Sequence, residues 1–256
     1  MAPKLKGLVG QPDSSAMPTS HFILLVEMDP HRTATLAAKL VRLGVEPIRV
    51  ADLIEASALV RSRSYSFSGV LLPAVLPPAL VAKALAHMRE SESVLPAMAY
   101  GKQPDVTACK ALRQCGVVLA LWDGYDEGML RFQLNRLVSK EQLSAARTSR
   151  RAPTQAPIRM LVGGREKHGT LYSLSEGGCF IETPRASMDG ARLHTLFELD
   201  GEHFELDGTV AFANVPGNLQ RPNLPLGMGV RFDNADTGMR TALARLIQAR
   251  LGALEV

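Results

Sequence analysis

The first part of the chain alternates short apolar runs with amphipathic segments. Five apolar runs begin at Phe22, Val45, Phe67, Leu95 and Gly116. The segments between them repeat apolar residues at helical spacing; one carries Leu36, Leu40 and Leu43 and has Gly44 as its expected C-cap. Because parallel strands need helical crossovers, the alternation predicts an α/β, flavodoxin-like domain over residues 21–140.

A helix from Asp126 to Ala146 is expected to close this domain. Its apolar stripe consists of Leu130, Leu134, Leu137 and Val138, and polar turns follow the stripe. The polar continuation should lead to the next domain. It could also pair with its copy in a second subunit, so a homodimer is a hypothesis, although the stripe is too short to predict a coiled coil.

The pattern then changes to the two-residue period of strands. Strand-like runs cover residues 158–164, 169–175, 178–183, 193–200, 204–213 and 228–232. Turns are expected at Gly163-Gly164, Asp189-Gly190 and Asp200-Gly201. A final amphipathic helix carries Met239, Leu243, Leu246 and Ile247. Residues 141–256 therefore predict a linker and an all-β, six-stranded antiparallel barrel with a C-terminal helix.

Composition supports two globular domains and limits the classes of protein. The chain has 256 residues, of which 46% are hydrophobic and 21% are charged. Its three cysteines lack CxxC spacing, which argues against a disulfide framework or a zinc site and favours a cytoplasmic location. Prolines interrupt the longest uncharged stretch, so no membrane span is predicted. Residues 1–20 lack the apolar core of a secretory signal and are expected to form a flexible tail.

Positive charge is concentrated at the domain junction. Six cations and one acid lie between Arg147 and Lys167, whereas the whole chain has a net charge of only +4. Such a concentration indicates a localised anionic partner. A solvated linker is the alternative. Nucleic-acid binding is less favoured, because the barrel strands lack the interleaved aromatic residues of single-strand platforms.

The opening ILLVEMDP and the strand ending VLLPAVLPP give residues 21–140 a resemblance to response-regulator receiver domains. Working receivers hold a divalent cation with acidic residues and phosphorylate an aspartate. The matching phosphoacceptor position here is Pro73, which offers no nucleophile, and the first acidic pair reads Glu27-Met28. Tyr100-Gly101 ends the fourth strand, and residues 120–123 replace the usual lysine.

These departures predict a phosphorylation-independent pseudo-receiver, whose remaining role is docking or dimerisation. Weak cation binding by Glu27 and Asp29 is an alternative, although two acids after a strand are more often ordinary loop residues.

Two short motifs in the second part of the chain carry the candidate chemistry when taken together. Arg147 and Arg151 form an RxxxR motif before the barrel, and Ser173 to Gly178 fit an xxSxxG pattern. With the closing strand Gly227 to Phe232 and its following helix, they resemble the PilZ domain family over roughly residues 147–251. This resemblance implies binding of cyclic di-GMP. The expected ligand residues are Arg147, Arg150, Arg151, Ser173, Ser175 and Gly178.

These residue types suit a ligand with two phosphates and two guanines. Guanidinium groups pair bidentately with phosphate oxygens or the guanine edge and stack on purines. A serine hydroxyl adds a hydrogen bond, and glycine permits close backbone approach. The family's second motif usually starts with Asp or Asn, where this chain has Ser173; losing that hydrogen bond should weaken binding by about 1–3 kcal/mol.

The expected function is therefore that of a cyclic di-GMP receptor, which orders its arginine-rich linker on binding and relays the signal to an unidentified protein partner. A scaffold in which both domains have lost their ligands is the alternative. No GxSxG, P-loop or GxGxxG motif occurs, so an enzyme is not expected. No cofactor or metal is expected either, because His168, His194 and His203 lack ligand spacing.

Overall fold

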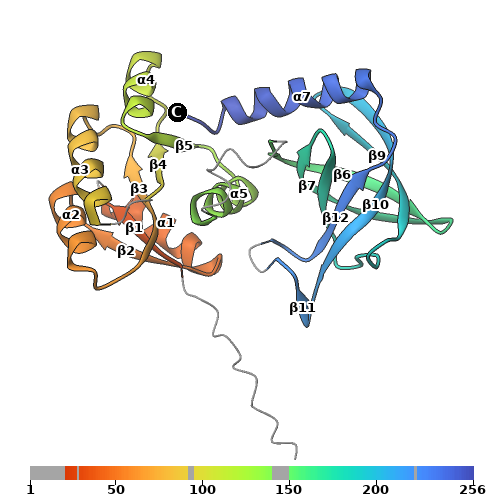
Figure 1. Ribbon diagram of the computed structural model, residues 1–256, viewed down its shortest axis with the longest axis horizontal. Coiled ribbons are helices and arrows are strands. Elements are labelled where there is room, and N and C mark those ends of the chain that lie inside the picture. The colour runs from red at the N-terminus through yellow and green to blue at the C-terminus, as the bar shows by residue number, and fades with distance from the viewer. Residues whose placement is uncertain (1–20, 28, 92–94, 140–149, 222–223) are drawn as a thin grey trace, which may run out of the picture.

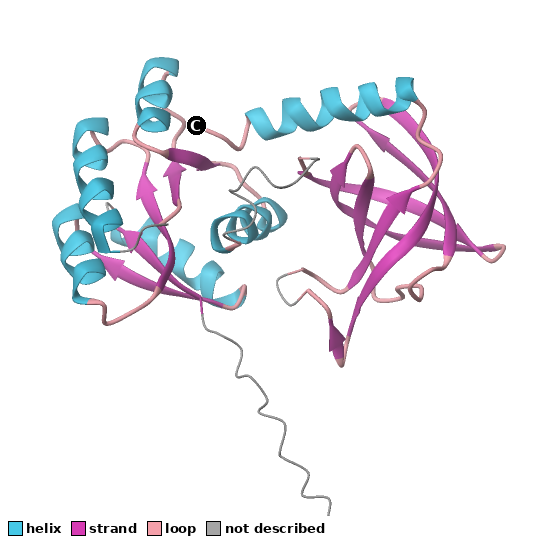
Figure 2. Ribbon diagram, in the orientation of Figure 1, coloured by secondary structure: helices cyan, strands magenta, loops and turns pink. Residues whose placement is uncertain are grey.

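The computed structural model describes residues 21–27, 29–91, 95–139, 150–221 and 224–256. The tail expected at 1–20, the helix continuation to Ala146 and Arg147 lie outside the described residues. The chain forms an α/β domain followed by a β-barrel domain (Figures 1 and 2).

A five-stranded parallel sheet forms the centre of the first domain. Its strands lie in the order β2-β1-β3-β4-β5, the order of flavodoxin-like folds. The strands are β1 (His21–Val26), β2 (Val45–Val50), β3 (Phe67–Pro73), β4 (Ala97–Gly101) and β5 (Val117–Trp122). The helices are α1 (Pro30–Arg42), α2 (Leu53–Ser62), α3 (Pro78–Ser91), α4 (Val106–Gln114) and α5 (Glu127–Val138). The predicted α/β fold is confirmed.

Apolar side chains cover both faces of this sheet, which explains its nearly continuous apolar strands. One face carries Leu24, Val70 and Leu72 in a cluster with residues of α2, α3 and α4. The other face carries Ile23, Leu25 and Leu71 in a cluster with residues of α1 and α5. Gly44 follows α1 with a φ of 77°, the left-handed conformation expected of a C-cap glycine.

The second domain is a closed antiparallel barrel, as predicted. Its order is β10-β12-β8-β7-β6-β9, and β9 also pairs with β10 to close the barrel. The strands are β6 (Ala152–Val162), β7 (Arg165–Ser175), β8 (Gly178–Glu182), β9 (Arg192–Leu199), β10 (Glu202–Val215) and β12 (Gly227–Phe232). The short strand β11 (Asn218–Leu219) adds to β10, and the helix α7 (Thr237–Gly252) follows the barrel.

Strand β6 begins earlier than the expected start at Ile158, so residues expected in the linker belong to the sheet. The register of β6 against β7 shifts between Pro153 and Ala156, and Gln155 there has a φ of 64°. Thr154 donates its hydroxyl hydrogen to the Leu171 carbonyl of β7. This irregularity follows Pro153, a residue that cannot donate to a regular ladder.

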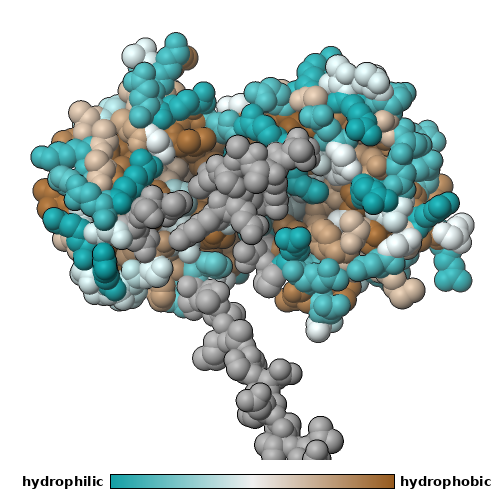
Figure 3. Space-filling view, in the orientation of Figure 1, coloured by the Kyte–Doolittle hydropathy of each residue, from teal (hydrophilic) through white to brown (hydrophobic). Residues whose placement is uncertain are grey.

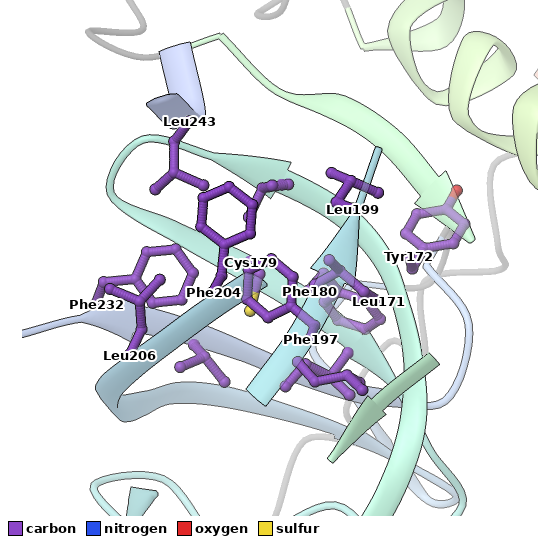
Figure 4. Close-up of a cluster of buried hydrophobic side chains, with 14 of the residues drawn as sticks. Leu171, Tyr172, Cys179, Phe180, Phe197, Leu199, Phe204, Leu206, Phe232 and Leu243 are labelled. Carbon is purple, nitrogen blue, oxygen red and sulfur yellow. The ribbon is translucent and has the colours of Figure 1, made fainter. Parts of the chain in front are cut away.

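Aromatic and aliphatic side chains fill the barrel (Figure 4). The rings of Phe197 and Phe204 stack with centroids 5.1 Å apart. Tyr172 and Phe180 pack edge to face at 5.9 Å. Outside, Figure 3 shows polar and apolar side chains interspersed on the visible face. No described helix has the length and apolar character needed to cross a bilayer.

Helix α5 lies between the sheet and the barrel (Figure 1). Its Phe132 is only 7% exposed and packs in the hydrophobic cluster of the barrel. Gln155 of β6 approaches α5 so closely that a Cβ on Gly128 would lie 2.0 Å from its Nε2 atom. The two domains therefore share an apolar contact.

Replacing Phe132 with alanine should destabilise this contact. Removing a buried phenylalanine ring costs about 3 kcal/mol in free energy of unfolding. Here the packing that is lost lies between α5 and the barrel. Urea unfolding measures it, with Val41→Ala on the exposed face of α1 as the control, since Val41 is 61% exposed. Equal stabilities of the two variants would contradict the assigned contact.

Residues 254–256, called here the C-terminal strand, run antiparallel along β5 at the edge of the first domain's sheet and form a single isolated bridge, between Glu255 and Leu119. The Ala120 amide donates to the Leu254 carbonyl at 2.9 Å, and the Val256 amide donates to the Val118 carbonyl at 3.1 Å. Val256 is buried in the cluster of the first domain, and Leu254 is buried in that of the barrel. Helix α7 thus leads the chain back to the sheet (Figure 1).

Candidate functional site

The carboxyl ends of the parallel strands are where ligands bind in open α/β sheets. Pro73 ends β3 there and is buried, so the phosphoacceptor position holds a ring without a nucleophile. The Tyr100 hydroxyl, at the end of β4, donates to the Val26 carbonyl at 2.6 Å. Burial raises the pKa of Tyr100, so this phenol stays neutral and serves as a structural donor.

The nearby acidic residues also have protein partners. Glu27 accepts two hydrogen bonds from Arg49 Nη2, at 2.8 and 2.9 Å. Asp29 is the N-cap of α1 and accepts from the amides of His31 and Arg32. These contacts favour structural roles over the weak cation binding left open by the sequence.

Strand register brings part of the arginine motif to the serine–glycine motif. Ala152 of β6 lies opposite Leu174 of β7, so the next residues on the two strands are Arg151 and Ser175. Arg151 is half-buried. Burial raises the pKa of the Cys179 thiol to about 12, and the charge of Arg151 opposes this rise. The strand register therefore puts Arg151 at the end of the strand pair where β7 turns into β8.

The serines of the second motif face the protein in this structure. Ser173 is 3% exposed and Ser175 is 2% exposed. The Ser175 hydroxyl donates to the Gly178 carbonyl at 2.9 Å and thereby closes the turn. The motif predicted this hydroxyl as a ligand contact, whereas in the structure it forms a local hydrogen bond.

Gly178 has a packing role as well. A Cβ at this position would lie 2.2 Å from the Val230 carbonyl oxygen of β12, so only glycine fits. The close backbone approach expected at Gly178 thus occurs within the barrel, between β8 and β12.

Arg150 contacts Glu255 and Gln248, two residues that no motif in the sequence had indicated. Its guanidinium forms an ion pair with Glu255 and a hydrogen bond of 3.1 Å with Gln248. Arg136 of α5 also pairs with Glu255, at 2.9 Å. No spacing rule predicts this cluster, because its members come from α5, the junction, α7 and the C-terminal strand.

The barrel histidines that were excluded as metal ligands pair with acids. His194 lies 2.7 Å from Asp207 and 2.9 Å from Glu205 through its two ring nitrogens. His168 lies 3.2 Å from Glu166, and among the described residues no group of three or more His, Cys, Asp or Glu side chains could hold a metal ion.

The His194 pair predicts a pH dependence of stability. The hydrogen bond to Asp207 has the largest effect on the pKa of His194 and raises it. Desolvation opposes this rise, and the hydrogen bond to Glu205 adds to it. Because the pKa of His194 is higher in the folded state, the protonated imidazole stabilises the fold. This contribution is fully present below the unfolded pKa of about 6.5 and is lost as pH rises through the folded pKa. The free energy of unfolding in urea should fall as pH rises from below about 6.5 to above the folded pKa of His194. His194→Gln should reduce this dependence on pH. His203→Gln, whose side chain is 83% exposed, should leave it unchanged.

A cavity of about 670 Å³ lies elsewhere on the barrel. Strands β6, β7, β9 and β10 line it, together with Met239 of α7, and none of the motif residues contributes. Its charged lining residues include Arg159 and Glu198, so it presents both signs of charge. This cavity gives no support to the arginine and serine–glycine site.

Three solved structures similar to this chain each cover less than half of it. The receiver domain of a Pseudomonas aeruginosa sensor histidine kinase is 24% identical, with 47% of this chain and 99% of that chain covered and a TM-score of 0.42. A putative response regulator from Chloroflexus aurantiacus is 19% identical, with 47% and 99% covered and a TM-score of 0.42. A Bacillus subtilis inhibitor of motility is 16% identical, with 43% of this chain and 53% of that chain covered and a TM-score of 0.36. The fold assignment rests on strand order and not on these scores.

A comparison with protein families gives a match in the second domain, while no curated protein matches the chain. The model of the PilZ domain matches residues 145–249, which include the barrel strands and most of α7. Residues 145–249 are therefore a PilZ domain, which follows an α/β domain with the strand order of response-regulator receivers.

Proposed function

We propose that this protein is a phosphorylation-independent cyclic di-GMP receptor that relays nucleotide binding to a protein partner. The observation that carries the proposal is the register of β6 and β7, which places Arg151 beside Ser175 within a chain segment matched by the PilZ family. The proposed ligand residues are Arg147, Arg150, Arg151, Ser173, Ser175 and Gly178.

The chemistry of the junction supports an anionic, planar ligand. Arginines there can pair with phosphate oxygens and stack on guanine faces, and a lysine could do only the first. With Ser175 engaged in its turn, the arginines supply most of the polar contacts in this proposal. Cyclic di-GMP therefore binds chiefly through guanidinium groups and backbone.

Phosphorylation is absent from the proposed mechanism. The side chain of Pro73 has no nucleophilic oxygen to accept a phosphoryl group, and Glu27 is engaged by Arg49. The first domain acts by docking to a partner, and its contacts with the barrel through α5 and the C-terminal strand connect it to the nucleotide site. A reducing cytoplasm suits the three cysteines, all of them free thiols.

Calorimetric titration of the full chain with cyclic di-GMP tests the proposal. Micromolar or tighter binding, with no comparable binding of cyclic di-AMP, is the expected result, because the guanine edge has a donor and acceptor pattern that adenine lacks.

A nucleotide-free interaction scaffold is the second candidate, favoured by the burial of Ser173 and Ser175. It predicts no heat of binding from folded protein. Circular dichroism on the same sample establishes folding, so a flat titration would favour the scaffold over the receptor.

A further inference from the structure

The C-terminal strand is held on β5 by more than its backbone hydrogen bonds. Gln133 of α5 is fully buried, and its amide nitrogen donates to the carbonyls of Ala120 and Leu254, each at 2.6 Å. One side chain of the first domain thus joins the edge strand β5 to the C-terminal strand. Arg136 extends this network, since it donates to the Gln133 amide oxygen at 3.2 Å.

Glu255 lies between two guanidinium groups, those of Arg136 and Arg150. Burial by itself raises the pKa of the Glu255 carboxyl, but the hydrogen bonds from Arg150 and Arg136 outweigh burial and hold this pKa below its usual value. The carboxylate is therefore ionised and depends on both cations for compensation.

The two cations differ in exposure. The side chains of Arg136 and Glu255 are each 14% exposed, whereas that of Arg150 is 50% exposed. Arg150 also immediately precedes Arg151 and the first barrel strand, so it belongs to the arginine segment of the proposed nucleotide site. It is the member of the cluster that solvent or a ligand can reach.

We propose that Glu255 competes with cyclic di-GMP for Arg150, so that nucleotide binding weakens the hold of the C-terminal strand on β5. The inference rests on the proposed function, because it requires the nucleotide to bind the arginine segment. A carboxylate and a phosphate are alternative acceptors for the same guanidinium fork, and Arg150 cannot satisfy both in full. When it turns to the nucleotide, the largely buried Glu255 keeps only Arg136 as a cationic partner.

Thermodynamic linkage makes this competition measurable through the nucleotide affinity as well as through the contact between Arg150 and Glu255. If the nucleotide weakens the contact with Glu255, removal of the Glu255 charge must strengthen nucleotide binding. We expect Glu255→Gln in the full chain to bind cyclic di-GMP about two- to fivefold more tightly than the wild type, the range expected for a partly exposed ion pair.

Glu202→Gln is the matched control. Glu202 pairs with Arg245 of α7, so this variant also removes one negative charge and one ion pair on the barrel. Its affinity for cyclic di-GMP should equal that of the wild type. An equal gain in both variants would assign the effect to net charge and overturn the proposed competition.

Hydrogen exchange of the wild-type chain gives a readout that needs no substitution. Adding cyclic di-GMP should speed exchange of the Ala120 and Val256 amides, which donate across the strand pair. Unchanged exchange together with equal affinities of wild type and Glu255→Gln would overturn this inference and leave the receptor function standing. Absence of nucleotide binding in both proteins would overturn the proposed function and this inference together.

Discussion

Arg151→Ala should lower the affinity for cyclic di-GMP about a hundredfold, since charge-assisted hydrogen bonds to a ligand are worth about 1.5–3 kcal/mol. The residue lies where β6 begins, beside the turn that starts at Ser175. The residue is already half-buried, so water poorly replaces the ligand contacts that the substitution removes. Calorimetric titration measures the change, and circular dichroism checks that the variant folds.

Arg165→Ala is the control for this experiment. Arg165 is exposed at the turn between β6 and β7, at the other end of the same strand pair, and its removal changes the net charge equally. Its affinity should stay within about twofold of the wild type, because exposed distant charges are screened by salt. Similar losses in both variants would point to general electrostatic attraction, and an unchanged Arg151→Ala affinity would place the nucleotide site elsewhere.

Gly178→Ala should destabilise the barrel by about 3 kcal/mol or more, the upper range for forced overpacking. The added methyl group would lie 2.2 Å from the Val230 carbonyl oxygen, and 3.2 Å from the Arg231 Cα atom. Both are backbone atoms of β12, so relief requires β8 and β12 to separate. Urea unfolding measures the loss.

Gly177→Ala tests whether this effect belongs to the position and not to glycine loss in general. Gly177 is exposed in the same turn, and a Cβ there would meet no atom within 4 Å. Its stability should change by only about 0.5 kcal/mol. If Gly178→Ala proved as stable as Gly177→Ala, the close approach of β8 and β12 would be refuted.

This pair of variants also bears on how the second motif is understood. Loss of nucleotide binding in Gly178→Ala would follow from damage to the barrel and would not by itself assign Gly178 to the ligand. The residue types of a short motif can reflect the turn that positions a site as well as the site itself.

The sequence predicted both folds because each has a strong local period. Uninterrupted apolar runs such as residues 22–26 indicate strands buried on both faces, and the barrel strands alternate. The start of β6 was placed too late, because Pro153 and Pro157 are typical of linkers and the register shift after Pro153 cannot be read from the local sequence.

The candidate site was only partly accessible to sequence reasoning. Motif spacing brought Arg151 and Ser175 to the same end of two strands, which the register supports. The pairing of Arg150 with Glu255 could not be foreseen, since it depends on how the two domains pack. The three residues of the C-terminal strand are too few to show a period, and their partner β5 lies far away in sequence.

The late position of the C-terminal strand has a consequence for protein synthesis. The five-stranded sheet can assemble as soon as its own residues leave the ribosome, but the segment that covers β5 is made only after the whole barrel and α7. Until then β5 presents unpaired backbone groups, which nascent chains on neighbouring ribosomes could pair with. Translation speed through the barrel should therefore influence how much of this protein reaches its native state.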